Sequence, residues 1–119
     1  MLQVERSNTI LYCERWAETV AFYRGLLGGA VTHENEWFVE LAVGDGSYLS
    51  IADAARATIA SAGGAGITLS WRVADVEATR LLLLDAGIAV TPVMMRFGAR
   101  VIDLFDPEGH RVELWSPVG

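Results

Sequence analysis

Glu113 and two tryptophans are the residues of this sequence whose chemistry most suggests a small-molecule site. A buried carboxylate with a raised pKa can act as a general base and transfer protons without a metal ion, so Glu113 is a candidate for that role. Trp37 and Trp115 could stack on an aromatic ligand. A structural role for the carboxylate remains open, as the partner of one of three arginines: Arg72, Arg100 or Arg111.

The residue types that usually ligate transition metals are scarce in this chain. Its single cysteine, Cys13, excludes a disulfide within the chain and a cysteine-based metal cluster, because each needs at least two cysteines. We expect Cys13 to be a small buried apolar side chain. The two histidines follow the first predicted helix (His33) and lie in a predicted turn (His110), and we expect both to face solvent.

Length and composition limit the classes of protein that this chain can belong to. Its 119 residues suit one compact domain, and 52% apolar against 20% charged residues exclude intrinsic disorder. A formal net charge of −6 with no basic run predicts no nucleic-acid partner. No apolar run approaches the roughly 18 residues of a membrane span, and the first residues do not resemble a signal peptide. We therefore expect a cytoplasmic protein with no membrane partner.

An internal repeat indicates which elements position the candidate residues. Gly-Gly-Ala-Val-Thr at residues 28–32 recurs as Gly-Ile-Ala-Val-Thr at 87–91. Apolar residues with helical spacing precede each copy, and the first predicted helix covers about 17–27. The second predicted helix begins after Asp75, a candidate N-cap, and ends before Gly87, a candidate C-cap glycine.

Each half of the chain also contains a predicted hairpin after its helix, with turns at 44–47 and 106–109. Each half therefore has the order strand, helix and then three strands. We place the first module at about 5–53 and the second at about 67–117. The intervening residues, 54–66, are rich in alanine and glycine and are interpreted as a linker within a single domain.

These features resemble one known family. The two βαβββ modules, the helix end at residues 21–28 (AFYRGLLG) and the closing hairpin at 105–114 (FDPEGHRVEL) are similar to the vicinal oxygen chelate superfamily. It includes glyoxalase I, bleomycin resistance proteins and extradiol dioxygenases, and the resemblance covers about residues 8–117. The resemblance implies an α+β fold in which two modules form a curved half-barrel of mixed sheet. It also implies a pocket on the concave face, often completed by a second chain.

The resemblance further implies where a divalent metal ion would bind in the metal-dependent members. The four ligand positions correspond here to Asn8, Ser50, Thr68 and Glu113, of which only Glu113 is a usual ligand. An amide, two hydroxyls and one carboxylate are a weak donor set for a transition metal. We therefore expect no metal ligands and no cofactor, and the alternative is a divalent metal ion.

Alternation of side chains along strands indicates which residues line this pocket. It places Arg111, Glu113 and Trp115 on one face and the residues between them in the core. Arg100 is included as a candidate partner of an anionic group. The expected ligand-binding residues are Asn8, Tyr12, Trp37, Ser50, Thr68, Arg72, Arg100, Glu113 and Trp115.

Three functions follow from these expectations. The preferred one is a metal-free binding protein of the bleomycin-resistance type, which sequesters a hydrophobic or cationic small molecule in the pocket. The alternative is a lyase, isomerase or dioxygenase-like enzyme that uses a divalent metal, or Glu113 as its general base. A structural or regulatory dimer is the third. We expect a homodimer in each case.

Overall fold

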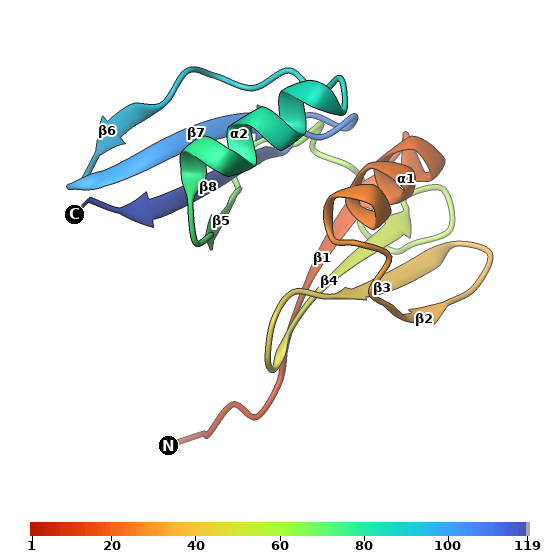
Figure 1. Ribbon diagram of the computed structural model, residues 1–119. Helices are drawn as coiled ribbons and strands as arrows, with labels where there is room; N and C mark the ends of the chain where they lie inside the picture. Colours follow the sequence, from red (N-terminus) through yellow and green to blue (C-terminus); the bar gives the residue numbers. More distant parts are fainter. Residues whose placement is uncertain (119) are drawn as a thin grey trace. The chain divides into compact units, whose positions relative to one another are not determined.

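The computed structural model describes residues 1–118 and divides into two compact units, the N-terminal unit Met1–Gly63 and the C-terminal unit Gly64–Gly119 (Figure 1). The N-terminal unit contains β1 (Ser7–Cys13), α1 (Trp16–Leu26), β2 (Val31–Glu34), β3 (Phe38–Ala42) and β4 (Ser47–Asp53). The C-terminal unit contains β5 (Thr68–Arg72), α2 (Val76–Asp85), β6 (Met94–Arg96), β7 (Ala99–Phe105) and β8 (Arg111–Pro117). The predicted α+β fold of two βαβββ modules is confirmed, and the division between the units falls within residues 54–66.

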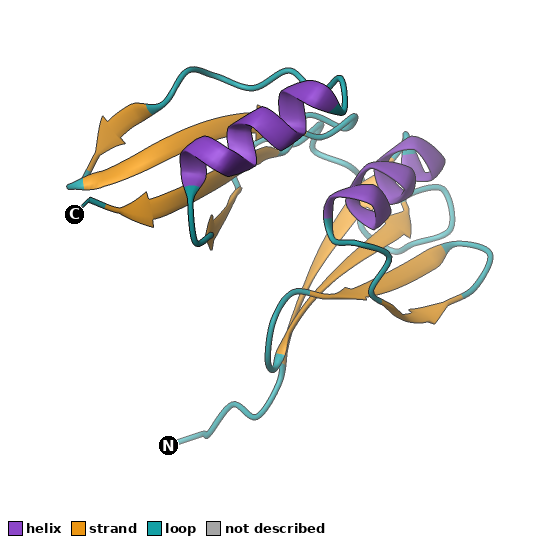
Figure 2. Cartoon of the chain, viewed as in Figure 1, coloured by secondary structure: helices purple, strands orange, loops and turns teal. Residues whose placement is uncertain are grey.

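Each unit is one four-stranded mixed sheet with one helix. The strand orders are β1-β4-β3-β2 and β5-β8-β7-β6, so the first strand of each module lies at an edge of its sheet and pairs with the last strand, which is an inner one. These two strands run parallel, and the other pairs are antiparallel. Figure 2 shows the helix of each unit lying against its own sheet. The opposite face of each sheet is therefore available for polar side chains.

The core of the N-terminal unit lies between α1 and its sheet. Tyr23 of α1 is fully buried, and the inward residues of the strands alternate with more exposed ones, as at Val39 and Leu41 of β3. The helix is anchored by the Trp16 indole, whose Nε1 donates to the Ile51 carbonyl oxygen at 2.8 Å. The helix begins at Trp16, one residue before the predicted start.

The C-terminal unit is organised in the same way around α2. Asp75 caps the helix as predicted, because its Oδ1 accepts from the Ala78 backbone N–H at 3.1 Å. Leu83 packs inward on the sheet, against a layer that includes the buried Ile102 and Val112. With 11 and 10 residues, neither of the helices described in residues 1–118 is long and apolar enough to cross a membrane.

The turn between β7 and β8 differs from expectation, because His110 is buried and not solvent-facing. Its side chain is only 7% exposed, and its Nδ1 lies 2.8 Å from Oδ2 of Asp106. The other Asp106 oxygen accepts backbone N–H groups from Glu108, Gly109 and His110, each at 2.9 Å. Gly64 covers this turn so closely that a Cβ at that position would lie 2.1 Å from the Gly109 carbonyl carbon. The end of the predicted linker thus closes the turn. His33, in contrast, is exposed as predicted.

Candidate ligand-binding site

The sheet face of the C-terminal unit that points away from α2 carries a pocket of about 280 Å³. The face is fixed by alternation along β8, because Val112, Leu114 and Ser116 are buried while the residues between them are partly exposed. Register extends the face across the sheet, since Val101 and Trp115 are directly opposed. The residues lining the pocket are Ser70, Arg96, Phe97, Ala99, Val101, Glu113 and Trp115.

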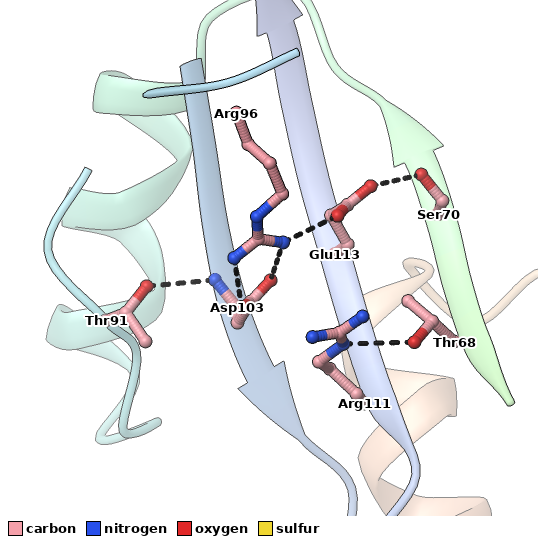
Figure 3. Close-up of polar contacts among 7 residues, drawn as sticks. All are labelled: Thr68, Ser70, Thr91, Arg96, Asp103, Arg111 and Glu113. Carbon is pink, nitrogen blue, oxygen red and sulfur yellow. Dashed lines mark hydrogen bonds and ion pairs between the residues drawn. The ribbon is translucent and has the colours of Figure 1, made fainter. Parts of the chain in front are cut away.

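The polar floor of this pocket is a network centred on Arg96, in which Ser70, Arg96 and Glu113 line the pocket and Asp103 lies outside its lining (Figure 3). Its Nη1 donates to Oε2 of Glu113 at 2.7 Å, and its Nη2 donates to Oδ2 of Asp103 at 2.9 Å. The other Glu113 oxygen, Oε1, accepts from the Ser70 hydroxyl at 2.6 Å. We call Ser70, Arg96, Asp103 and Glu113 the Arg96 cluster. Every oxygen of Glu113 therefore has a protein donor.

The charges of the Arg96 cluster do not balance. One guanidinium faces two carboxylates, so the cluster carries one negative charge in excess. The carboxylate of Asp103, followed by that of Glu113, raises the pKa of Arg96 above its usual value and keeps the guanidinium protonated. The side chains of Asp103 and Glu113 are only 9% and 18% exposed, so solvent screens this excess charge incompletely.

The rest of this face combines a second polar pair with an aromatic wall. Thr68 accepts from Nε of Arg111 at 3.0 Å, below the Arg96 cluster in Figure 3. The guanidinium carbon of Arg72 lies 5.6 Å from the ring centroid of Trp115, within cation–π range. Thr68, Arg72, Glu113 and Trp115, all predicted site residues, therefore belong to one face of one sheet.

Arg100 lies on the other face of the same sheet. It is opposed to the buried Ser116, whose hydroxyl contacts the start of α2, and its side chain pairs with Glu77 of that helix. The structure therefore does not bring Arg100 together with Glu113. The predicted arginine partners of Glu113 were also wrong, because Arg96 from β6 forms the ion pair.

The remaining predicted residues belong to the N-terminal unit. Ser50 is buried and donates to Oδ1 of Asn8 at 2.8 Å, so these two residues are joined. The amide of Asn8 also donates to Glu40 at 3.3 Å, and Arg6 donates to the same carboxylate at 2.6 Å. Half-buried Tyr12 lies further along β1, opposite Ala52 of β4.

Trp37 is the fourth predicted site residue of the N-terminal unit. It is half-buried, and its ring packs edge-on against Phe38 with 5.6 Å between the centroids. The predicted ligand-binding residues are thus distributed over both units.

Sequence reasoning missed two features of the site. One is the pairing of Arg96 with Glu113, and the other is the presence of Asp103 and Glu40. Asp103 is the one charged residue in the otherwise apolar run 101–105 (VIDLF), a signal in the sequence that could have identified it. It lies directly opposite Glu113, so the strand alternation already applied to β8 would have placed both carboxylates together.

The four positions that correspond to metal ligands do not form a suitable donor set. Asn8 and Ser50 are hydrogen-bonded to each other, and Thr68 accepts from Arg111. Both oxygens of Glu113 are held by Ser70 and by a guanidinium, which a metal ion would have to displace. Among residues 1–118, no group of three or more histidine, cysteine, aspartate or glutamate side chains is placed to hold a metal. These residues do not fit a divalent metal.

Comparisons with solved structures identify the fold. A lactoylglutathione lyase from Agrobacterium tumefaciens is 19% identical, with a TM-score of 0.78 over 98% of this chain and 96% of that one. An antibiotic-binding protein from a Streptomyces species is 20% identical, with a TM-score of 0.77 over 99% and 98% of the two chains. A second Agrobacterium tumefaciens protein, solved by NMR, is 25% identical, with a TM-score of 0.78 and full coverage of both chains.

Sequence comparison gives the family. No curated protein matches this chain significantly. The sequence model of the Glyoxalase/Bleomycin resistance protein/Dioxygenase superfamily, however, matches residues 6–114, which is nearly the whole chain and includes both modules. The chain therefore belongs to the Glyoxalase/Bleomycin resistance protein/Dioxygenase superfamily.

Proposed function

We propose that this protein binds a small molecule in the pocket of the C-terminal unit, without a metal ion. The proposed ligand has an apolar or aromatic part and a positive charge. The observation that carries this proposal is the combination of an anionic floor, the Arg96 cluster, with a wall formed by Val101, Ala99 and Trp115. A concave apolar surface with a few fixed polar groups is the usual composition of a small-molecule site.

The sign of the ligand charge follows from the excess carboxylate. Within the Arg96 cluster, Asp103 and Glu113 share a single guanidinium, so the cluster itself attracts a cationic group, while Arg72 and Arg111 of the same face add two positive charges outside it. The net charge of −6 acts in the same direction at longer range.

Binding is better supported than catalysis by Glu113. A general base must have a lone pair free to take a proton from the substrate. Both oxygens of Glu113 already accept hydrogen bonds, one from Ser70 and one from Arg96, so a substrate proton would compete with two donors held in place by the fold. The antibiotic-binding protein and the lyase, at 20% and 19% identity, each share the fold alone, so the comparisons do not decide between binding and catalysis.

The proposal is tested by isothermal titration of chelator-treated protein with two planar dyes, cationic proflavine and anionic fluorescein. We expect proflavine to bind at least tenfold more tightly than fluorescein. Glu113→Gln should weaken proflavine binding by roughly tenfold or more, the value of a charge-assisted contact. Trp115→Ala should weaken it by roughly fivefold.

Arg100→Gln is the matched control, because Arg100 belongs to the same sheet but to its opposite face. This variant should bind proflavine as the unaltered protein does. Preference for fluorescein, or equal binding by all variants, would contradict the proposal. Circular dichroism of each variant establishes that the fold is retained.

We also propose that the chain forms a homodimer, as expected from its family resemblance. Light scattering at high protein concentration tests this, and a strictly monomeric mass would contradict it.

A further inference from the structure

Phe97 combines two properties that its own fold does not explain. It occupies the two-residue turn between β6 and β7 with a φ of 52°, and it is the one non-glycine residue of residues 1–118 in the left-handed region. Its side chain is also fully exposed. A bulky residue at positive φ is unfavourable, and an exposed ring makes no compensating contact within the unit.

The turn itself does not require a phenylalanine. Arg96 pairs with Ala99, so the turn consists of Phe97 and Gly98, both with positive φ. Two-residue hairpins of this kind favour asparagine or aspartate at the first position and glycine at the second. Gly98 follows that preference and Phe97 does not. The turn therefore carries a ring at a position where a smaller polar residue would fold more easily.

The position of Phe97 relates its ring to the pocket. Phe97 lines the pocket and directly follows Arg96 in sequence. It therefore lies next to the Arg96 cluster, at the edge of the sheet formed by β6. Trp115 is the other aromatic residue of the lining. Strained residues of this kind concentrate at sites that bind ligands, where the contact with the ligand offsets the strain.

We propose that Phe97 is a specificity-determining residue of this pocket, which packs its ring on the flat aromatic part of a ligand whose cationic group binds at the Arg96 cluster. This inference rests on the proposed function and adds the ligand class: planar aromatic cations are selected over alkyl cations. Aromatic packing is geometric, so a flexible alkyl chain recovers less of the contact.

The test replaces Phe97 by asparagine in the full chain and measures binding of proflavine and of hexylammonium, an alkyl cation. We expect Phe97→Asn to weaken proflavine binding by about five- to tenfold and to change hexylammonium binding less than twofold. We also expect its melting temperature to rise by about 2–4 °C, because asparagine tolerates positive φ. Met95→Asn is the control. Met95 is another exposed apolar residue of the same hairpin, but it lies opposite Arg100, on the sheet face that does not carry the pocket.

Several results would overturn this inference. A lower melting temperature for Phe97→Asn would mean that the ring stabilises the fold. Unchanged proflavine affinity in Phe97→Asn, with Trp115→Ala still weakened, would refute the role of Phe97 and leave the proposed function intact. Loss of a dimer in Phe97→Asn by light scattering, without loss of proflavine affinity, would assign the ring to a second copy of the chain. Absence of proflavine binding to the unaltered protein would refute both proposals.

Discussion

Replacement of Gly64 by alanine tests how the C-terminal unit is closed. Gly64 is buried against the turn that contains Asp106 and His110, and that turn leads directly into β8, which carries Glu113. A Cβ on residue 64 would lie 2.1 Å from the Gly109 carbonyl carbon and 2.3 Å from its oxygen. These neighbours are backbone atoms, so they cannot move aside as a flexible side chain would.

The expected loss of stability has two parts. Gly64 has a φ of 86°, and an alanine in the left-handed region costs about 1–2 kcal/mol. Overpacking against backbone costs roughly another 1–3 kcal/mol, through displacement of the turn. For a chain of this size, about 1 kcal/mol corresponds to a shift of roughly 4 °C in the melting temperature. Gly64→Ala should therefore melt about 8–20 °C below the unaltered protein.

Gly66→Ala separates the two parts, because Gly66 has a similar φ of 81° and no atom within 4 Å of an added Cβ. This control should melt only about 4–8 °C lower. Both variants are measured by calorimetry under identical conditions. Equal shifts in melting temperature for the two variants would refute the close packing of residue 64 on the backbone of the turn.

Three further predictions concern other parts of the chain. Removal of the α2 N-cap by Asp75→Ala should cost about 1 kcal/mol in urea denaturation, and Asp85→Ala, at the last residue of the same helix, should cost less. Hydrogen bonds from Thr32 and Arg6 hold the pKa of Glu40 below its ordinary value of 4.5, so its contribution to stability is present above pH 4.5 and is lost as pH falls through the lower folded-state value. The stability difference between the unaltered protein and Glu40→Gln should accordingly shrink between pH 5 and pH 2, and a constant difference would contradict this. Addition of divalent ions to chelator-treated protein should leave the melting temperature unchanged, whereas an ion-selective rise of about 10 °C would reveal a metal site.

The fold could be predicted because its signals are local. The helix boundaries follow from apolar spacing, the Asp75 cap and the glycines after each helix, and the two hairpin turns follow from their turn residues. The internal repeat also predicted that both halves have the same order of strands and helix, which no single element indicates. These signals involve residues close in sequence, which is why no tertiary information was needed.

The errors in the site have a common cause, which is that they depend on contacts between distant segments. Val101, Ile102, Asp103 and Leu104 are all buried, so burial along β7 does not alternate, although alternation of side chains along the strand places Arg100 on the face opposite to Asp103. β6 has only three residues, too few to show a period, so its end was not placed beside Glu113. The backbone of the turn at Gly109 and His110 is covered by Gly64, far away in sequence, a contact that no turn pattern contains.

The most direct test of the proposed pocket is a two-dimensional amide NMR titration of the isotope-labelled, chelator-treated chain with proflavine. We predict that chemical-shift changes concentrate in 68–72, 94–103 and 111–115, the strands and turn that form the pocket. Changes confined to α2 or to the N-terminal unit, or changes that require an added divalent ion, would contradict a metal-free ligand site at the Arg96 cluster.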